Sequence, residues 1–298
     1  MSTNYNRGRR DRSEIRKQTR AKRTAATAKS VERKIIKLKK KPSVIRHKDT
    51  VLPRNKPYKP ERSEEIRLNR FIANAGICSR READKYIAAG IVTVNNKTVT
   101  EMGVKVKMTD DVRLDGKRLN AEHKVYVLLN KPKGFTTTTE DPKEDITVMD
   151  LVKDACNERI YPVGRLDKNT TGLLLLTNDG GLAERPSHPS HRVKKIYQVT
   201  LDKQVTKNHM LQIAEGIELE DGPIAADMIS FIDPANKFEV GLEIHSGRNR
   251  IVRRIFEHLG YRVKKLDRIY FAGLTKKNLP RGKWRLLSGK EVQYLKMK

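Results

Sequence analysis

The chain has 298 residues, of which 37% are hydrophobic and 34% charged, and its formal net charge is +28. No apolar run approaches the length of a membrane-spanning helix, the first residues lack the apolar core of a secretory signal, and the two cysteines lie outside any zinc or disulfide pattern. We therefore expect a cytoplasmic protein without membrane attachment or a structural metal. The excess of Lys and Arg favours a nucleic acid as partner over a basic protein without that role.

The first part of the chain, residues 1–62, is predicted to be a disordered basic tail. It carries 22 Lys and Arg against 5 Asp and Glu, a net charge of +17, with too few apolar residues to offset the entropy of an ordered chain. The remaining residues keep a net charge of +11. A polyanionic partner is therefore expected even without the tail.

Residues 63–120 are predicted to form a small basic domain of two helices followed by a short sheet. Apolar residues after Ile66 recur at helical spacing up to Gly76, and Ser79-Arg80-Arg81-Glu82 has the spacing of a capping box that opens a second helix. The expected hairpin turns are Asn95-Asn96 and Asp115-Gly116, between strands at 91–94, 98–99, 104–106, 112–114 and 117–119.

In residues 121–298 the pattern changes to longer apolar strands, and we expect a second, mixed domain there. Its strands are separated by long and irregular connections, which favours a mostly antiparallel sheet over a doubly wound one. The predicted fold class of the whole chain is therefore α+β. The expected strands are 125–129, 173–176, 197–201, 239–244 and 263–266, and the expected helices are 147–152, 206–214 and 248–258.

The stretch with the clearest chemical content surrounds Asp167. Gly164 and Gly172 enclose a polar loop, and the apolar run 173–176 predicts a buried strand that holds this loop in place. A carboxylate on such a braced loop, with Arg165 two residues away, is a candidate nucleophile or base. The alternative is an aspartate that only caps the turn.

Two further stretches supply cations and an aromatic ring. Arg250, Arg253, Arg254 and Glu257 lie three or four positions apart, which predicts one side of a helix that can meet phosphates or a carboxylate. Strand alternation over residues 194–199 places Tyr197 beside basic side chains, where its ring can stack on an unpaired base. A solvated basic face and a core tyrosine are the alternative interpretations.

In this order, the three stretches resemble the bacterial ribosomal pseudouridine synthases of the RsuA type. Gly164-Arg165-Leu166-Asp167 followed by Thr171-Gly172-Leu173-Leu174 is a highly specific signature, and residues 66–119 resemble the αL RNA-binding domain of ribosomal proteins. The resemblance covers about residues 64–290. It implies an isomerase that needs no cofactor, acting as a monomer on ribosomal RNA or an assembling ribosomal subunit, with features of the large-subunit enzymes labelled B and F.

Carried over position by position, the resemblance assigns three catalytic residues. Asp167 is the catalytic carboxylate, Tyr197 stacks on the target uracil, and Arg253 pairs with Asp167. The target uridine stays open, and so does whether the carboxylate adds to the base or acts at the sugar. Substrate contacts are expected from Arg165, Arg250 and Leu266 in the second domain and from Arg67, Arg70, Arg80, Arg81 and Lys85 in the first.

Two other interpretations remain possible from the residues alone. An RNA-binding assembly factor on an inactive synthase fold would share the same charge, although the intact trio argues against it. A metal-dependent RNA hydrolase would need a cluster of ligands, and no carboxylate pattern accompanies the available histidines. These histidines are His188, His191, His245 and His258.

Overall fold

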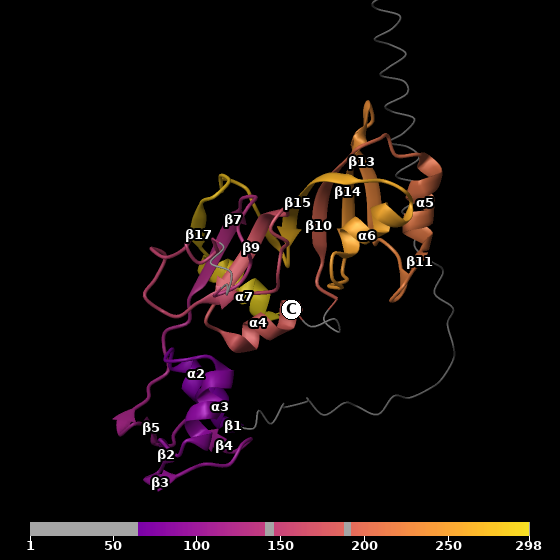
Figure 1. Ribbon diagram of the computed structural model, residues 1–298. Helices are drawn as coiled ribbons and strands as arrows, with labels where there is room; N and C mark the ends of the chain where they lie inside the picture. The colour runs from indigo at the N-terminus through magenta and orange to yellow at the C-terminus, as the bar shows by residue number, and fades with distance from the viewer. Residues whose placement is uncertain (1–64, 141–145, 188–191, 298) are drawn as a thin grey trace, which may run out of the picture. The chain divides into compact units, whose positions relative to one another are not determined.

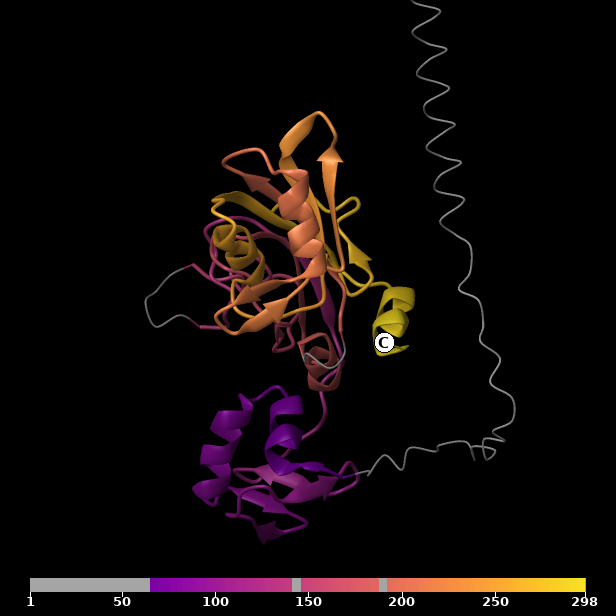
Figure 2. The same cartoon turned by 90° about the vertical axis from the view of Figure 1, so that its right-hand side faces the viewer.

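The computed structural model describes residues 65–140, 146–187 and 192–297 (Figures 1 and 2). The predicted basic tail, residues 1–62, lies outside the described residues. Within the described ranges, no helix is both long enough and apolar enough to cross a bilayer.

Residues 65–119 form a unit of two helices and short strands around their own apolar core. The predicted capping box is confirmed: Ser79 Oγ accepts a hydrogen bond from the Glu82 N–H at 3.3 Å, and the Glu82 carboxylate accepts one from the Ser79 N–H at 2.6 Å. The helices are α2 (Leu68–Asn74) and α3 (Arg80–Ala88). The strands are β1 (Glu65–Arg67), β2 (Val92–Val94), β3 (Lys97–Thr98), β4 (Lys105–Lys107), β5 (Val112–Leu114) and β6 (Lys117–Arg118).

Both predicted hairpin turns of this unit are present. Asn95 and Asn96 have φ angles of 50° and 65°, and Asp115 and Gly116 have 49° and 73°, as a type I′ turn requires. The turns join β2 to β3 and β5 to β6 in an antiparallel sheet of order β3-β2-β5-β6, while β1 pairs with β4. Strand β1 is not predicted by the sequence, because its three residues are too few to show a period.

The second part of the chain is built on one nine-stranded sheet. Its main order is β13-β14-β10-β15-β9-β7-β17, and all of its pairings are antiparallel except that of β9 with β15. The mostly antiparallel sheet is therefore as predicted. Its strands are β7 (Tyr126–Lys131), β8 (Tyr161–Pro162), β9 (Thr171–Thr177), β10 (Lys195–Leu201), β13 (Met228–Asp233), β14 (Asn236–Ile244), β15 (Val263–Phe271), β16 (Leu274–Thr275) and β17 (Trp284–Leu286).

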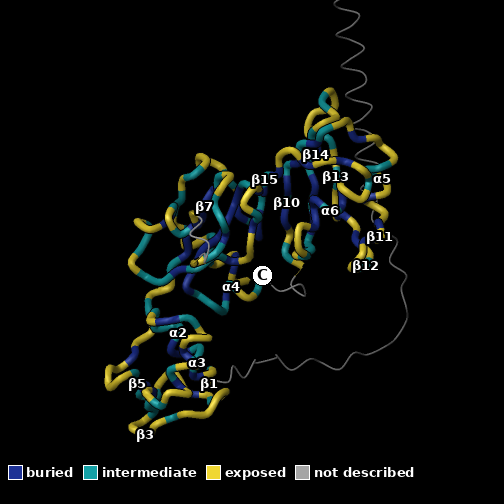
Figure 3. Tube along the Cα trace, viewed as in Figure 1, coloured by how far each residue is buried: buried dark blue, intermediate teal, exposed yellow. Residues whose placement is uncertain are grey.

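Separate apolar clusters cover the two halves of this sheet. In the β10–β14 half, one cluster gathers α5 (Lys207–Glu215), α6 (Ile251–His258) and the hairpin of β11 (Ile217–Leu219) and β12 (Gly222–Ile224). In the β7–β9 half, α4 (Gly180–Ser187) and α7 (Gly289–Met297) pack on one face and residues 148–166 on the other. Strand β7 is accordingly buried along its whole length, whereas buried and partly buried residues alternate along β10, and β14 is buried only at Val240, Leu242 and Ile244 (Figure 3).

Two predicted helices differ from the structure. Residues 147–152 form successive turns instead of an α-helix: the N–H groups of Leu151 and Val152 donate to carbonyl oxygens three residues back, those of Val148 and Met149, and not four residues back. The helix expected from residue 248 begins only at Ile251, since Arg250 before it has a left-handed φ of 47°.

The parallel pair β9–β15 joins the two halves, and it is short. Only two pairs of residues are in register, Asp267 with Thr171 and Arg268 with Gly172. A Cβ atom at position 172 would lie 2.3 Å from the Arg268 carbonyl oxygen, so only glycine allows this approach. The loop that carries Asp167 leads directly into this seam.

Candidate active site

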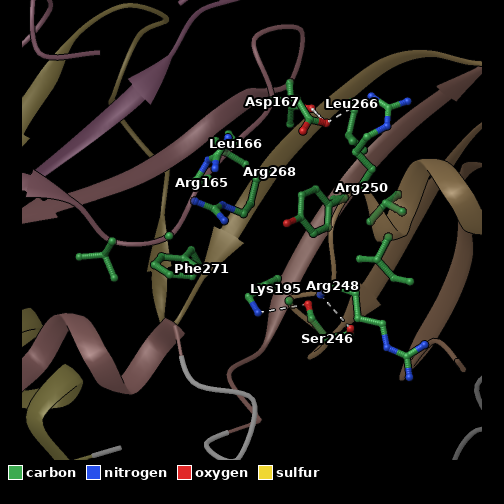
Figure 4. Close-up of a pocket in the computed structure, with 17 residues that line it drawn as sticks. Arg165, Leu166, Asp167, Lys195, Ser246, Arg248, Arg250, Leu266, Arg268 and Phe271 are labelled. Carbon is green, nitrogen blue, oxygen red and sulfur yellow. Dashed lines mark hydrogen bonds and ion pairs between the residues drawn. The ribbon is translucent and has the colours of Figure 1, made fainter. Parts of the chain in front are cut away.

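A pocket of about 150 Å³ lies at the seam between the two halves of the sheet. Its walls come from the loop 163–170, strands β10 and β15, and the segment 246–252 that leads into α6. Figure 4 shows Asp167 and Leu266 toward one end of the pocket and Lys195 and Ser246 toward the other. Of the residues predicted to form a site, the structure brings five to these walls: Arg165, Asp167, Tyr197, Arg250 and Leu266.

The Asp167 loop is fixed on the side that precedes Asp167. The Val163 N–H donates to the Leu175 carbonyl of β9 at 2.7 Å, and the Thr137 hydroxyl donates to the Leu166 carbonyl at 2.8 Å. Leu166 itself is buried in the apolar cluster beneath the loop. Asp167 faces the pocket with its side chain 35% exposed, and its Oδ2 accepts a hydrogen bond from Thr170 at 3.3 Å.

Lys131 holds the same loop from below. Its side chain is fully buried, and Nζ donates to the carbonyl oxygens of Asp167 at 3.1 Å, Thr170 at 3.0 Å and Lys168 at 3.3 Å. Burial lowers the pKa of Lys131 to about 8. The sequence places this lysine at the end of a buried strand, but only the fold shows that its ammonium group binds the loop backbone.

Arg253 supplies the cation that approaches Asp167. It is buried on α6, its Nη1 donates to the Val263 carbonyl at 3.2 Å, and its Nε lies 3.5 Å from Asp167 Oδ2. That Nε has no hydrogen-bond partner among the described residues, and the distance is longer than a good hydrogen bond. Arg250 Nη1 is 4.0 Å from the same oxygen and more exposed. The carboxylate is thus held loosely, between two guanidinium groups.

Tyr197 and Leu266 come from neighbouring strands. Tyr197 lies on one buried face of β10 together with Lys195 and Val199, because burial alternates along this strand. Val199 pairs with Leu266 and Tyr197 with Arg268 across the β10–β15 ladder. An aromatic ring in a pocket beside an aliphatic side chain can hold a planar base between them.

The predicted common face of the arginine helix is wrong. Arg253 points into the core toward Asp167, whereas Arg254 binds Asp221 through both Nη atoms, at 2.6 and 2.8 Å. Arg250 precedes the helix, and its side chain reaches both Asp167 and Glu257. The helix starts three residues later than expected, which removes Arg250 from it, and Arg253 and Arg254 point apart because adjacent residues project from a helix about 100° from each other.

The remaining predicted contact residues lie in the 65–119 unit and at the rim of the pocket. Arg67 ends β1, Arg70 lies on α2, and the other three lie on α3. All of them are exposed except Arg70, which is partly buried. Arg165 is exposed beside Asp167. The three residues on α3 are Arg80, Arg81 and Lys85.

The histidines do not gather into a metal site in the described part of the chain. No group of three or more His, Cys, Asp or Glu side chains is placed there to hold an ion. His245 Nδ1 lies 2.8 Å from Asp227, and His258 is exposed at the end of α6. His188 and His191 lie outside the described residues.

Two buried cations in the pocket were not singled out by the sequence analysis as site residues. Arg268 is 3% exposed and Lys195 is 9% exposed, and both line the pocket. A signal for them was present: Arg268 is two residues from Leu266, and Lys195 is two residues from Tyr197, so each shares a strand face with a predicted site residue. A basic residue on a buried strand face is uncommon, but its burial is visible only in the fold.

Two family models match separate parts of the chain. A family model described as RNA pseudouridylate synthase matches residues 125–258, and one described as S4 domain matches residues 66–112. The ribosomal large subunit pseudouridine synthase B of Bacillus subtilis is 41% identical over 233 residues, which cover 77% of this chain and 95% of the relative. The dual-specificity RNA pseudouridine synthase RluF of Escherichia coli is 37% identical over 230 residues, covering 76% of this chain and 77% of the relative.

A solved structure is similar as well. The crystal structure of a pseudouridylate synthase superimposes with a TM-score of 0.56 at 32% sequence identity, over 77% of this chain and 99% of that one. Together with the sequence relatives, this similarity confirms the predicted fold class and the resemblance on which the site residues were chosen.

Proposed function

This chain belongs to the RNA pseudouridylate synthase family, and we propose that it isomerises a uridine of ribosomal RNA, in the large subunit, with Asp167 as the carboxylate that acts on the target nucleotide. The observation that supports the proposal is a pocket lined by Asp167 and Tyr197, with the Nε of the buried Arg253 3.5 Å from the Asp167 carboxylate. The name of the B. subtilis relative supports the large ribosomal subunit as the source of the substrate.

The reaction is balanced within the nucleotide itself. The N1–C1′ bond of uridine breaks, a C5–C1′ bond forms, the C5 proton leaves and N1 gains a proton, so no oxidant or group donor is consumed. The target base must leave the helix stack before these atoms can be reached. The pocket is large enough to admit a base but has an enclosed floor, which suits a flipped nucleotide that enters base first.

Each member of the trio has a role that follows from its position. Tyr197 stacks on the uracil and fixes the plane in which it can turn. Arg253 keeps a positive charge near Asp167, and its free Nε can close the present 3.5 Å gap when RNA covers the site and excludes water. Arg165 and Arg250 are exposed at the rim, where they can bind the phosphates on either side of the target.

In this proposal the RNA is bound mainly by the 65–119 unit and by the basic tail of residues 1–62. We propose residues 63–120 as the docking domain and 121–298 as the catalytic domain. The cations of β1, α2 and α3, all exposed except the partly buried Arg70, bind phosphates, which position the RNA without reading its sequence. These cations are Arg67, Arg70, Arg80, Arg81 and Lys85.

The proposal is tested by mapping pseudouridine in ribosomal RNA. A strain lacking the gene should lose the modification at one or a few uridines, and the wild-type gene should restore it. The Asp167→Ala variant should bind RNA and fold as the wild type does, because the loop keeps its backbone contacts, yet restore nothing. Identical pseudouridine maps with and without the gene would show that ribosomal RNA is not the substrate. Restoration of the modification by Asp167→Ala would show that the carboxylate is not required. An assembly factor on an inactive fold would give the first of these results.

A further inference from the structure

The floor of the pocket holds two positive charges without a carboxylate partner. Arg268 Nε donates to the Leu173 carbonyl at 2.8 Å, while its Nη2 is buried and has no hydrogen-bond partner among the described residues. Lys195 Nζ donates to the His245 and Ser246 carbonyls at 3.1 and 3.2 Å. Neither residue forms an ion pair in the described part of the chain. Buried charges are normally paired with a carboxylate, whereas the side chain that interacts with Arg268 here is that of Tyr197, so the buried Nη2 is available to an acceptor on a ligand.

The fold presents the Arg268 guanidinium to the pocket in a fixed position. Strand β15 has a bulge at Ile269, between the pairs Tyr197–Arg268 and Ile196–Tyr270. Because of this extra residue, Arg268 and Phe271 both face the pocket although they are three residues apart. The guanidinium carbon lies 4.3 Å from the centre of the Phe271 ring, so the group is held by stacking as well as by the bond from Nε.

Exposure orders the pocket from its rim to its floor. The side chains of Arg250 and Asp167 are 46% and 35% exposed, whereas Tyr197 is 9% and Arg268 only 3% exposed. A nucleotide inside an RNA chain has a phosphate on both sides, so it enters such a pocket base first and leaves its phosphates at the rim. A sugar beside Asp167 therefore sends the base along Tyr197 toward Arg268, and Figure 4 shows Arg268 between Asp167 and Lys195.

We propose that Arg268 binds the uracil through a pyrimidine carbonyl oxygen and stabilises the negative charge that the base carries during the isomerisation, with Lys195 as a second positive charge behind it. This inference rests on the proposed function and names a further catalytic residue for it. Arg268 offers only N–H donors, and uracil offers two carbonyl acceptors, so the two groups are complementary.

Negative charge reaches the pyrimidine oxygens whichever way Asp167 acts. If the N1–C1′ bond breaks first, its electron pair stays on the base and is shared among N1, O2 and O4. If the carboxylate adds to C6, the electron pair of the 5,6 double bond moves to O4 as an enolate. In both cases the base is neutral in the product only after C5 has bonded to C1′ and lost its proton, N1 has gained a proton and, in the addition route, the carboxylate has left C6. A fixed cation in a site without water stabilises such a transient charge more strongly than it stabilises the neutral base.

The unpaired state of the two cations has a cost in the resting protein. Burial lowers the pKa of Lys195 to about 8, and the neighbouring Arg268 adds to that effect. Burial also lowers the pKa of Arg268 itself. A site that leaves two like charges together without a counterion is prepared for an anionic occupant, as expected for a group that binds the transition state better than the substrate.

The proposal is tested with single-turnover kinetics on transcripts of large-subunit ribosomal RNA that contain uridine tritiated at C5. Tritium release measures the loss of the C5 hydrogen, and filter binding measures the Kd for the same RNA. Arg268→Gln keeps a donor for the Leu173 carbonyl but removes the charge, and it should lower the single-turnover rate by about 100-fold with Kd unchanged. Arg268→Lys, which keeps the charge, should retain more activity. Arg285→Gln, which breaks a surface pair with Glu291, is the matched control and should behave as the wild type does.

Two results would overturn the proposal. One is an unchanged rate for Arg268→Gln. The other is a loss that appears as weaker RNA binding, which would mean that Arg268 binds a phosphate. If the wild-type protein releases no tritium from ribosomal RNA, the proposed function is wrong, and this inference fails with it. The wild-type reaction therefore distinguishes a failure of the proposed function from a failure of the role given to Arg268.

A second measurement needs no variant, in case Arg268→Gln does not fold. Barbiturate is a pyrimidine with the size of uracil, and it is an anion at neutral pH. It should inhibit the wild-type enzyme at a lower concentration than uracil does. Equal inhibition by the two compounds, or stronger inhibition by uracil, would contradict an electrostatic role for Arg268.

Discussion

Replacing Lys131 with methionine removes the support under the Asp167 loop while keeping a side chain of similar length. The ammonium group of Lys131 donates to carbonyl oxygens of Asp167, Lys168 and Thr170, which lie within four residues of one another. Methionine fills the same space but donates nothing. The three carbonyl oxygens then lose their donor, and because position 131 is fully buried, water cannot replace it.

The expected magnitude follows from those three bonds. Each lost hydrogen bond costs about 1 kcal/mol, so the free energy of unfolding should fall by about 3 kcal/mol, less whatever is gained by no longer burying a charge. For a domain of this size, that loss corresponds to a fall of about 6 to 12 °C in Tm. Since a misplaced carboxylate reacts poorly, the single-turnover rate should fall by about tenfold.

The assay is thermal unfolding combined with tritium release from ribosomal RNA at a temperature where both proteins are folded. Lys133→Met is the control, because Lys133 is only two residues away but is exposed. A Lys131→Met protein that melts with the wild type would refute the reasoning, since it would show that the loop carbonyls do not depend on this ammonium group. A large loss of stability with full activity would refute only its link to Asp167.

Three further outcomes are expected. Arg253→Ala should lower the single-turnover rate far more than Arg254→Ala, because only Arg253 approaches Asp167, at 3.5 Å; equal rates would reject that assignment. Gly172→Ala should lower the unfolding free energy by about 2 kcal/mol or more, since the new Cβ would lie 2.3 Å from the Arg268 carbonyl oxygen, and calorimetry showing wild-type stability would contradict the close approach. Deleting residues 1–62 removes a charge of +17 and should flatten the salt dependence of RNA binding; an unaltered slope would mean that the tail does not contact RNA.

Local signals in the sequence predicted local structure well. The capping box at Ser79, the two hairpin turns and the buried strand before Thr177 each depend on a few neighbouring residues whose backbone preferences agree with the final fold. The turns of residues 147–152 were not predicted, because an apolar pattern of this length fits one turn of helix as well as the hydrogen bonds between residues three apart that the structure shows.

The site was only partly predictable, because its residues come from segments far apart in the chain. Asp167 and Tyr197 stood out through their own motifs, but the partners that hold them did not. Lys131 is 36 residues from Asp167, and nothing in either segment indicates that one will bind the backbone of the other. Arg268 is found only by extending the strand face of Leu266 and then observing that the face is buried. Contacts of this kind depend on the register of the sheet, which a single sequence does not specify.

The seam explains why these partners are where they are. Each half of the sheet has its own apolar core, and the two halves meet through only two residue pairs of β9 and β15. Polar bonds reinforce this short ladder: Asp267 accepts from the hydroxyl of Thr171 and from Arg281, each at 2.8 Å, and from Lys276. Burial alone would raise the pKa of Asp267, but these bonds lower it to about 2.

The polar bonds of Asp267 hold the two strands together on one side of the seam, and the pocket lies on the other side. Because Asp267 ties the strands together from behind, its neighbour Arg268, which points into the pocket, need not serve as an ion-pair partner in the fold. The sheet can therefore keep a guanidinium without a carboxylate partner at the pocket floor, held to β9 by the bond from Arg268 Nε to the Leu173 carbonyl. On this reasoning the two adjacent residues divide the work: the carboxylate of Asp267 secures the junction, and the cation of Arg268 is left available for the base.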